Sequence, residues 1–199
     1  ADHTFSLHGL LEGGITFVCL YGLHDPLRAN VKDAIAKART AGIRIFMLTG
    51  DHKLTALRVG VELGLLQDEQ RLVEGDAFTR SDDGTRSKIL ETATVFARVA
   101  PEDKLALVQA LKERGEVVAM TGDGVNDAPA LAQADIGIAL GSGSDTAKEV
   151  ADIVLMDNNF SVIISAIREG RIIFNNIRTV ILYFLADSFS AIIVLLSSF

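Results

Sequence analysis

The tripeptide Thr-Gly-Asp occurs twice in the chain, and each copy directly follows a short apolar run. Thr49–Asp51 comes after the run IRIFML, and Thr121–Asp123 comes after VVAM. A threonine hydroxyl can donate to a phosphate oxygen, and a glycine lets backbone N–H groups approach an anion closely. Because the carboxyl ends of parallel strands line the ligand crevice of an open sheet, we expect both tripeptides on one rim. Either copy alone is equally well explained as a turn whose Asp caps a helix.

The second copy extends into Gly-Asp-Gly-Val-Asn-Asp over Gly122–Asp127, which is a much more specific pattern. Asp123 and Asp127 are four residues apart on a glycine-bent loop, so their carboxylates repel each other unless a cation lies between them. Oxygen ligands beside a phosphate site suit Mg²⁺. We therefore expect both carboxylates to bind Mg²⁺; the alternative is that both only cap turns.

Two cations precede this loop in the chain. Arg98 lies near the carboxyl end of the apolar run Val95–Val99, where it forms either a salt bridge at the rim or a bidentate phosphate contact. Lys104 stands in the first turn of a helix opened by Pro101, and a lysine there opposes the helix dipole. Such a lysine is usually just solvated, but its place between the two tripeptides favours an anion nearby.

Between Ile15 and Arg178, short apolar runs alternate with helical segments, which is typical of an α/β fold with a largely parallel sheet. Three helical patterns are followed by a glycine at the expected C-cap position: Gly42, Gly64 and Gly115. The expected strands are Ile15–Leu20, Ile43–Leu48, Val95–Val99, Val117–Thr121, Ile136–Leu140 and Ile153–Met156. The expected helices are Asn30–Thr40, His52–Leu63, Glu102–Arg114, Ala128–Ala132, Asp145–Val150 and Ser161 onward.

Two segments carry weaker patterns. Gln67–Arg86 is polar, with its clearest turn at Ser81–Gly84, and we expect a surface excursion without chemistry. Residues 1–14 are expected to be the end of a preceding nucleotide-binding region or a linker. They lack the charged start and apolar stretch of a signal peptide.

Composition limits the classes of function. With 199 residues and 21.3 kDa, the chain is long enough for one domain with appendages. It has 19 Lys and Arg against 26 Asp and Glu, a net charge of −7, which excludes an electrostatic nucleic-acid binder. The single cysteine, Cys19, excludes an internal disulfide and a cysteine-based metal site, and the four histidines have no ligand spacing.

The last 21 residues, Thr179–Phe199, are apolar, and Asp187 is their only charged residue. As a helix this segment spans about 31 Å, close to the thickness of a hydrocarbon core. The apolar side chains outweigh the cost of one Asp, so we expect membrane insertion; a buried amphipathic helix is the alternative. The arginines that precede it, Arg168, Arg171 and Arg178, mark its cytoplasmic side.

Five motifs together resemble the P-type cation-transporting ATPases, over about Ile15 to Tyr183. They are LHDPLR at 23–28, MLTGD at 47–51, VFARVAPEDK at 95–104, MTGDGVNDAPAL at 120–131 and GSGSDTAKEVADIVL at 141–155. The resemblance implies an α/β, haloacid-dehalogenase-like Rossmannoid parallel sheet with flanking helices, followed by a long stalk and transmembrane helix. It implies a phosphorylation domain over 15–160, a stalk over 161–178 and part of the family's fifth transmembrane helix over 179–199.

The resemblance also implies catalytic roles. Asp123 is similar to the family's Mg²⁺ ligand, with Asp127 and Asn126 as its supporting carboxylate and hydrogen-bonding neighbour. Thr49 resembles the residue that holds the phosphoryl oxygens, and Lys104 resembles the one that stabilises charge on the transferred group. ATP as substrate and Mg²⁺ as cofactor follow from this similarity.

Further positions resemble the family's nucleotide contacts. Arg98 is similar to a residue that reaches the nucleotide, and Gly50 and Asp51 resemble residues at the nucleotide and phosphate cleft, which Thr49 and Lys104 also line. Asp25 and Arg28 resemble the hinge toward the nucleotide-binding domain.

One departure from the family is decisive. The family's nucleophile is the Asp of an Asp-Lys-Thr-Gly-Thr motif, and this motif is absent between Ala1 and Phe199. We therefore expect a piece of a longer pump, inactive alone, that needs the missing N-terminal part of the polypeptide. Two alternatives stay open: a soluble phosphatase of the same superfamily, and a module that binds Mg²⁺ and phosphate or nucleotide without a nucleophile.

The intact protein is expected to be an integral membrane protein. Residues 1–178 would be cytosolic, and residues 179–199 would contact lipid. Its partners would be ATP and a transported cation, not nucleic acid. Asp187, Ser188 and Ser190 offer oxygens within the membrane, either as cation ligands or as helix-packing contacts. The motifs look more like the calcium, sodium-potassium or proton class of pump than the heavy-metal class.

Overall fold

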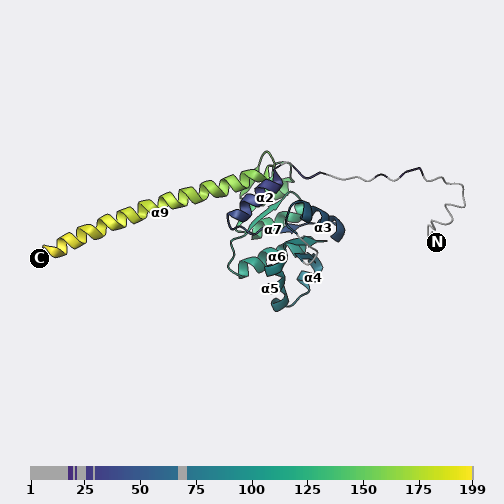
Figure 1. The fold of residues 1–199 in the computed structure, drawn as a ribbon, viewed down its shortest axis with the longest axis horizontal. Helices are drawn as coiled ribbons and strands as arrows, with labels where there is room; N and C mark the ends of the chain where they lie inside the picture. The colour runs from purple at the N-terminus through teal and green to yellow at the C-terminus, as the bar shows by residue number, and fades with distance from the viewer. Residues whose placement is uncertain (1–17, 20, 22–25, 29, 67–70, 199) are drawn as a thin grey trace.

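The computed structural model describes residues 18, 19, 21, 26–28, 30–66 and 71–198. Their helices and strands alternate as the sequence predicts (Figure 1). The helices are α2 Val31–Thr40, α3 Lys53–Glu62, α4 Gly75–Thr79, α5 Asp83–Thr92, α6 Pro101–Glu113, η2 Val125–Asp127, α7 Ala128–Gln133, α8 Asp145–Val150 and α9 Phe160–Ser197. The strands are β1 Met47–Leu48, β2 Leu72–Glu74, β3 Val95–Ala97, β4 Ala119–Gly122, β5 Ile136–Leu140 and β6 Ile153–Leu155.

The strands form two three-stranded parallel sheets, in the orders β1-β3-β2 and β4-β5-β6. In the first sheet Leu48 is paired with Phe96, and in the second Gly122 is paired with Ala139. Parallel pairing needs a crossover between strands, and the helices supply it. All described strands therefore end toward the same side of their sheet.

Helices cover the sheets and bury a continuous apolar core. On one face of the first sheet, α2 and α3 pack against Val95 and Ala97. On its other face Phe78 of α4, Leu90 of α5 and Leu107 of α6 surround Phe96. In the second sheet, α6, α7 and α8 pack against β4 and β5 around Leu131, which is 1% exposed. Because α6 contributes to both sets, it binds the two sheets together.

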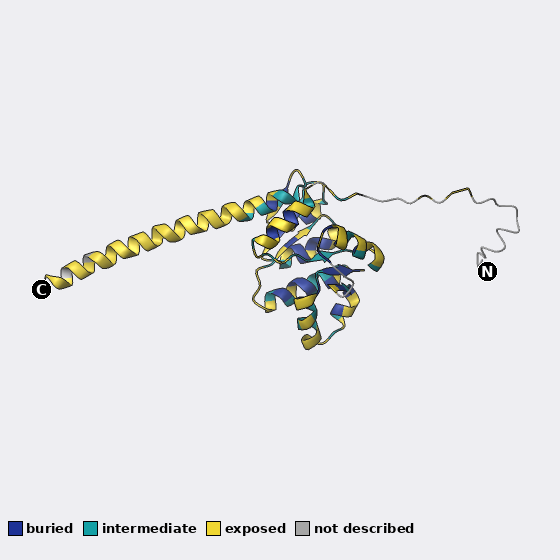
Figure 2. Cartoon of the chain, in the orientation of Figure 1, coloured by how far each residue is buried: buried dark blue, intermediate teal, exposed yellow. Residues whose placement is uncertain are grey.

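Helix α9 begins in the core and then leaves it. Phe160, Ile163 and Ile167 of its first turns pack against Ile138 and Leu155. Beyond these turns the helix runs away from the body, and its surface is exposed along almost its whole described length (Figures 1 and 2). Among the described residues α9 alone is long and apolar enough to cross a membrane, over Phe160–Val194.

Most predicted elements are confirmed within one or two residues at each end. The exceptions are the first-sheet strand expected over Ile43–Leu48, of which only Met47 and Leu48 are paired, and Ile15–Leu20, which lies largely outside the described residues. Gly42, Gly64 and Gly115 have φ of 77°, 72° and 76°, so the C-cap prediction is confirmed.

The expectation of a surface excursion over Gln67–Arg86 is wrong for the described residues of that segment. They contain β2, α4 and the start of α5, and β2 pairs in parallel with β3. Phe78 of α4 is 0% exposed and stacks edge-on against Phe96, with ring centroids 5.9 Å apart. The segment was misjudged because one buried aromatic among polar residues gives no periodic signal.

Candidate functional site

Both Thr-Gly-Asp tripeptides lie at the carboxyl ends of parallel strands. Thr49 follows β1, and its backbone N–H donates to the carbonyl of Phe96 at 3.0 Å. The second tripeptide ends β4, so Asp123 is the first residue beyond the sheet. In an open α/β sheet this end is where ligands bind.

The first tripeptide is joined to the segment that follows β3. The carbonyl of Thr49 accepts from the N–H of Val99 at 3.0 Å, and the carbonyl of Asp51 accepts from the N–H of Arg98 at 3.0 Å. Arg98 has a φ of 49°, in the left-handed region that residues other than glycine seldom adopt. The exposed Arg98 side chain lies 3.9 Å from the carboxylate of Glu74 at the end of β2. This bend therefore keeps a cation at the rim beside Asp51.

Lys104 and Asp127 form an ion pair between the start of α6 and the loop that follows β4. The Nζ of Lys104, in the first turn of α6, lies 2.6 Å from Oδ1 of Asp127. The side chains are only 18% and 9% exposed, so the pair is shielded from solvent. The position of Lys104 in the first turn of α6 predicts an anion nearby. In this structure that anion is the carboxylate of Asp127, on the glycine-bent loop.

Asp127 also shapes that loop. Its Oδ2 accepts from the backbone N–H groups of Asp123 and Gly124, each at 3.2 Å. A Cβ at Gly122 would lie 2.5 Å from the Cβ of Asp127, so only glycine leaves room for the carboxylate to fold beneath the loop. Asp127 is therefore fully engaged by Lys104 and the backbone.

The side chain of Asp123 is exposed on the rim, as is that of Asn126. Mg²⁺ is commonly bound by one or two carboxylates together with water and phosphate oxygens, so the exposed Asp123 fits a single ligand position. Within the described residues no three His, Cys, Asp or Glu side chains come together as a complete metal site. Asp123 is thus suited to share Mg²⁺ with a phosphate, whereas the metal role predicted for Asp127 stays a prediction.

Sequence inspection missed the contact that fixes the start of α6. Asp103 is buried, and it accepts from the N–H of Ala100 at 2.9 Å and from the hydroxyl of Thr79 in α4. A capping carboxylate three residues into a helix is a recognisable signal, but its partner on α4 is 24 residues away. Asp103 holds the first turn of α6, and with it the neighbouring Lys104, against α4.

The strands that carry the tripeptides are both at edges of their sheets. Neither β1 nor β4 has a second neighbouring strand among the described residues, although IRIFML and VVAM read as strands buried on both faces. Leu48 of β1 and Val118, which precedes β4, each pack against the apolar cores of both sheets. The edges formed by β1 and β4 therefore border the same apolar core.

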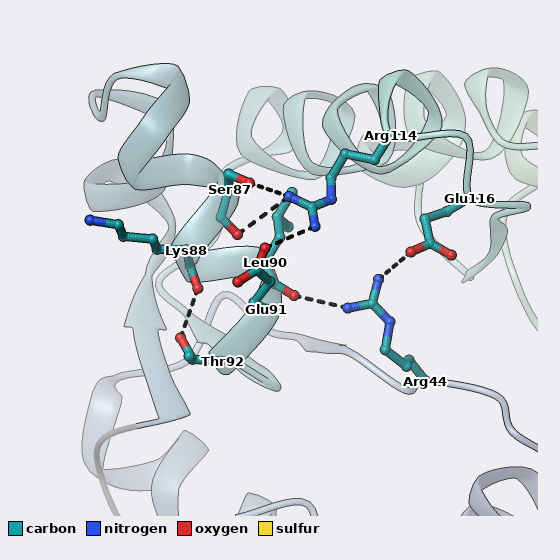
Figure 3. Close-up of polar contacts among 8 residues, drawn as sticks. All are labelled: Arg44, Ser87, Lys88, Leu90, Glu91, Thr92, Arg114 and Glu116. Carbon is teal, nitrogen blue, oxygen red and sulfur yellow. Dashed lines mark hydrogen bonds and ion pairs between the residues drawn. The ribbon is translucent and has the colours of Figure 1, made fainter.

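Ion pairs connect the ends of these strands that are remote from the tripeptides (Figure 3). Arg44, which precedes β1, lies 2.8 Å from Glu116, which precedes β4. A neighbouring pair joins two helices: Arg114, directly after α6, lies 3.2 Å from Glu91 of α5. Arg44 and Glu116 therefore connect the two edges at one end, and near the other end Lys104 and Asp127 connect the start of α6 to the loop that follows β4.

Of the two residues expected at the hinge, Asp25 is outside the described residues and Arg28 lies away from this rim. Arg28 is exposed and donates to the carbonyl of Asn158 at 3.0 Å, next to the base of α9. Gly50 lies between Thr49 and Asp51 and is exposed on the rim.

Comparison with known families identifies the class of this fold and site. Residues 4–135 match the family described as haloacid dehalogenase-like hydrolase, and residues 104–167 match a second family with the same description. The chain belongs to the haloacid dehalogenase-like hydrolases.

Within that class, curated relatives narrow the resemblance. The chain is 50% identical to calcium-transporting ATPase 1 of Yarrowia lipolytica over 90% of its length, and 47% identical to calcium-transporting ATPase 1 of Bacillus cereus over 93%. It spans only 20% and 21% of those proteins. The predicted resemblance to P-type cation-transporting ATPases is confirmed.

Solved structures of P-type ATPases share the fold. A zinc-transporting PIB-type ATPase in its E2·Pi state matches 78% of this chain and 21% of its own, with 34% identity and a TM-score of 0.61. The catalytic domain of the CPx-ATPase CopB-B matches 70% of this chain and 45% of its own, with 32% identity and a TM-score of 0.53. The predicted haloacid-dehalogenase-like fold is confirmed.

Proposed function

We propose that this chain is part of an ATP-driven, calcium-transporting P-type pump and supplies one half of its phosphorylation site. One observation carries the proposal: the Lys104–Asp127 pair, 2.6 Å apart, lies below a rim where both Thr-Gly-Asp tripeptides follow parallel strands. The names of the relatives supply the cation, because the proteins that match most of this chain are calcium-transporting ATPases.

The proposed roles follow from what each side chain can reach. Thr49 and Lys104 would hold the oxygens of the γ-phosphate, and Asp123 would take one ligand position of Mg²⁺, with Asn126 beside it and Asp127 supporting the loop. Bound Mg²⁺ would neutralise charge on the phosphate groups. Gly50, Asp51 and Arg98 would form the part of the rim that faces the nucleotide.

The nucleophile would come from outside this chain. A carboxylate there would attack the γ-phosphorus, the bond from phosphorus to the bridging oxygen would break, and ADP would leave with that electron pair. We place this carboxylate on a strand between β1 and β4, because both are edge strands with the sequences of central ones and both end at the rim. Such a strand would bring its carboxyl end between Thr49 and Asp123.

The domain boundaries belong to the same proposal. Residues 1–14 would end a preceding region, 15–160 would form the phosphorylation domain, 161–178 the stalk and 179–199 part of a transmembrane helix. The apolar surface of α9 supports this division, since Ile181, Phe184, Ile193 and Leu196 are each at least half exposed. A soluble phosphatase would have no use for such a helix.

The experiment uses the full-length polypeptide that contains this chain, in membrane vesicles. Incubation with γ-³²P-labelled ATP and Mg²⁺ should give an acid-stable phosphoprotein only when Ca²⁺ is present. Lys104→Met and Asp123→Asn should each lower the rate of phosphorylation by about 100-fold or more, because each removes charge stabilisation from the transferred group.

Lys148→Met is the matched control. Lys148 is in α8, 3.8 Å from the exposed Asp145, and its loss should leave phosphorylation unchanged. Phosphorylation that is the same with and without Ca²⁺ would overturn the assignment of the cation. Labelling that persists at the normal rate in Lys104→Met would overturn the assignment of the site.

A further inference from the structure

A short loop after β5 lies directly against the rim loop that carries Asp123. The N–H of Ser144 donates to the carbonyl of Asp123 at 2.8 Å. A Cβ at Gly143 would lie 2.8 Å from that same carbonyl oxygen, so the two backbones touch and only glycine permits it. Any displacement of the Asp123 backbone therefore displaces the loop Gly141–Ser144.

The other side of this loop is held by the carbonyl of Leu155, which accepts from the N–H of Gly141 at 2.7 Å, and by the side chain of Asn158. Its Oδ1 accepts from the N–H of Ser142 at 3.2 Å, and its Nδ2 donates to the hydroxyl of Ser142 at 3.0 Å. Asn158 has a φ of 53°, a left-handed conformation that asparagine tolerates better than most residues. The oxygen and the nitrogen of the Asn158 side-chain amide therefore both form hydrogen bonds with Ser142.

Asn158 itself belongs to the base of α9. Its N–H donates to the carbonyl of Leu155 at 3.2 Å, at the end of β6, and its carbonyl accepts from Arg28 at 3.0 Å. Two residues later α9 begins, with Phe160 packed against the cores of both sheets. Arg171, three turns along α9, donates to the carbonyl of Ala41 at the end of α2 at 2.9 Å.

We propose that Asn158 is a positioning residue that couples the Asp123 loop to α9, through Ser142. The inference rests on the proposed function. If the rim binds the phosphate groups of ATP, the coupling would connect the state of the phosphate site to the position of the membrane helix. The route has two contacts, Asp123 to Ser144 and Ser142 to Asn158, with one loop between them, and it runs beside the backbone contact of Gly141 with Leu155. It needs no movement of the sheets themselves.

Substitutions at Asn158 can separate this role from folding. Asn158→Gly keeps the left-handed backbone and removes the amide, so it breaks both contacts with Ser142 without backbone strain. Asn158→Asp should restore them, because a carboxylate accepts from the N–H of Ser142 and also from its hydroxyl, which can reverse and donate. Asn30→Gly is the matched control: Asn30 is also left-handed, with a φ of 72°, and its side chain makes no capping hydrogen bond.

The first measurement is amide hydrogen exchange on this chain in detergent micelles. In Asn158→Gly, exchange at Ser142 should accelerate about fivefold to tenfold, and in Asn158→Asp and Asn30→Gly it should match the parent chain. Unchanged exchange in Asn158→Gly would overturn the contact, whatever the function of the whole protein.

The second measurement is the ratio of Ca²⁺ transported to ATP hydrolysed by the full-length polypeptide in sealed vesicles. Asn158→Gly should lower this ratio by at least about twofold while phosphoprotein formation from ATP persists, and Asn158→Asp should restore the ratio. An unchanged ratio, or an equal loss of phosphorylation and transport, would overturn the coupling. If the parent protein forms no Ca²⁺-dependent phosphoprotein, the proposed function fails and the coupling with it, while the exchange result still decides the contact.

Discussion

Lys104 compensates the charge of Asp127, one of the two carboxylates on the glycine-bent loop. From the sequence, two carboxylates on one loop require a cation between them, and Mg²⁺ is the expected one. In the structure, Lys104 compensates Asp127, and Asp123 is the carboxylate left exposed. The two acidic residues of this motif are therefore not equivalent: Asp127 organises the loop, and Asp123 is exposed on the rim.

Removing the lysine should destabilise the protein. Lys104→Met would leave Asp127 buried without its partner, and we expect a loss of about 3 kcal/mol in the free energy of unfolding. Pulse proteolysis in urea, with α9 held in detergent micelles, measures this loss. The double variant Lys104→Met/Asp127→Asn should be more stable than Lys104→Met, because the amide keeps an acceptor for the loop N–H groups without a buried charge.

Lys148→Met is the control for this prediction, since its partner Asp145 is exposed and 3.8 Å away. We expect a change of about 0.5 kcal/mol or less. Equal losses for Lys104→Met and Lys148→Met would show that the buried pair contributes no more than a surface pair.

Asp135 gives the fold a dependence on pH. Its carboxylate accepts from the N–H of Val118 at 2.9 Å and lies 3.1 Å from Lys112, and these contacts lower its pKa, the backbone hydrogen bond most. A carboxyl whose pKa is lower in the folded state stabilises the fold above its unfolded pKa of about 4 and loses that effect as the pH falls through the folded value.

Asp135→Asn should therefore be less stable than the parent at pH 7, and the difference should shrink below about pH 4. The measurement is pulse proteolysis across a pH series. Asp145→Asn, at an almost fully exposed carboxyl, is the control and should show a smaller difference. A difference at Asp135 that stays constant down to pH 2 would contradict the prediction.

Helix α4 braces the start of helix α6, which carries Lys104. Phe78 fills the core between α5 and β3, and Thr79 donates to Asp103 at the first turn of α6. The short helix thereby fixes the direction in which α6 begins, on which the position of Lys104 depends. A polar segment that looks like a loop is thus part of the site's support.

Phe78→Ala should cost about 3–5 kcal/mol of unfolding free energy, since the side chain is 0% exposed and its loss leaves a cavity. The same pulse-proteolysis measurement applies. Leu54→Ala is the control, because Leu54 of α3 is 66% exposed and its truncation should have little effect. A loss below 1 kcal/mol for Phe78→Ala would mean that α4 does not brace the core.

The described part of the molecule joins the rim that carries both Thr-Gly-Asp tripeptides to a long helix. Helix α9 is one uninterrupted element of 38 residues, about 57 Å long, that starts in the core and ends in an apolar segment. The exposed apolar surface of its distal half needs a membrane or other apolar surroundings.

Cysteine accessibility tests this arrangement. In a Cys19→Ser background, which removes the single exposed native thiol, Gly170→Cys should react with a membrane-impermeant maleimide after reconstitution into liposomes, and Ile193→Cys should be protected. Both sites are exposed on α9, so only lipid can distinguish them. After detergent solubilisation and denaturation both should react. Equal labelling in intact liposomes would contradict membrane insertion.

Short-range patterns were sufficient to predict the tripeptides at strand ends, the glycine-bent loop and the apolar helix. Each depends on residues adjacent in the chain, through backbone conformation, capping and periodicity. The identity of the fold followed from the same local motifs. The elements β2, α4 and α5 were missed, because the segment that forms them has no clear period.

The pairing of side chains depended on the fold. Lys104 and Asp127 are 23 residues apart, Thr79 and Asp103 are 24 apart, and Ser142 and Asn158 are 16 apart. Such contacts form because packed helices and strands bring distant segments together, and no spacing along the chain encodes them. The same reason explains β1: its sequence is apolar from Ile43 to Leu48, but which residues pair depends on the strand beside it.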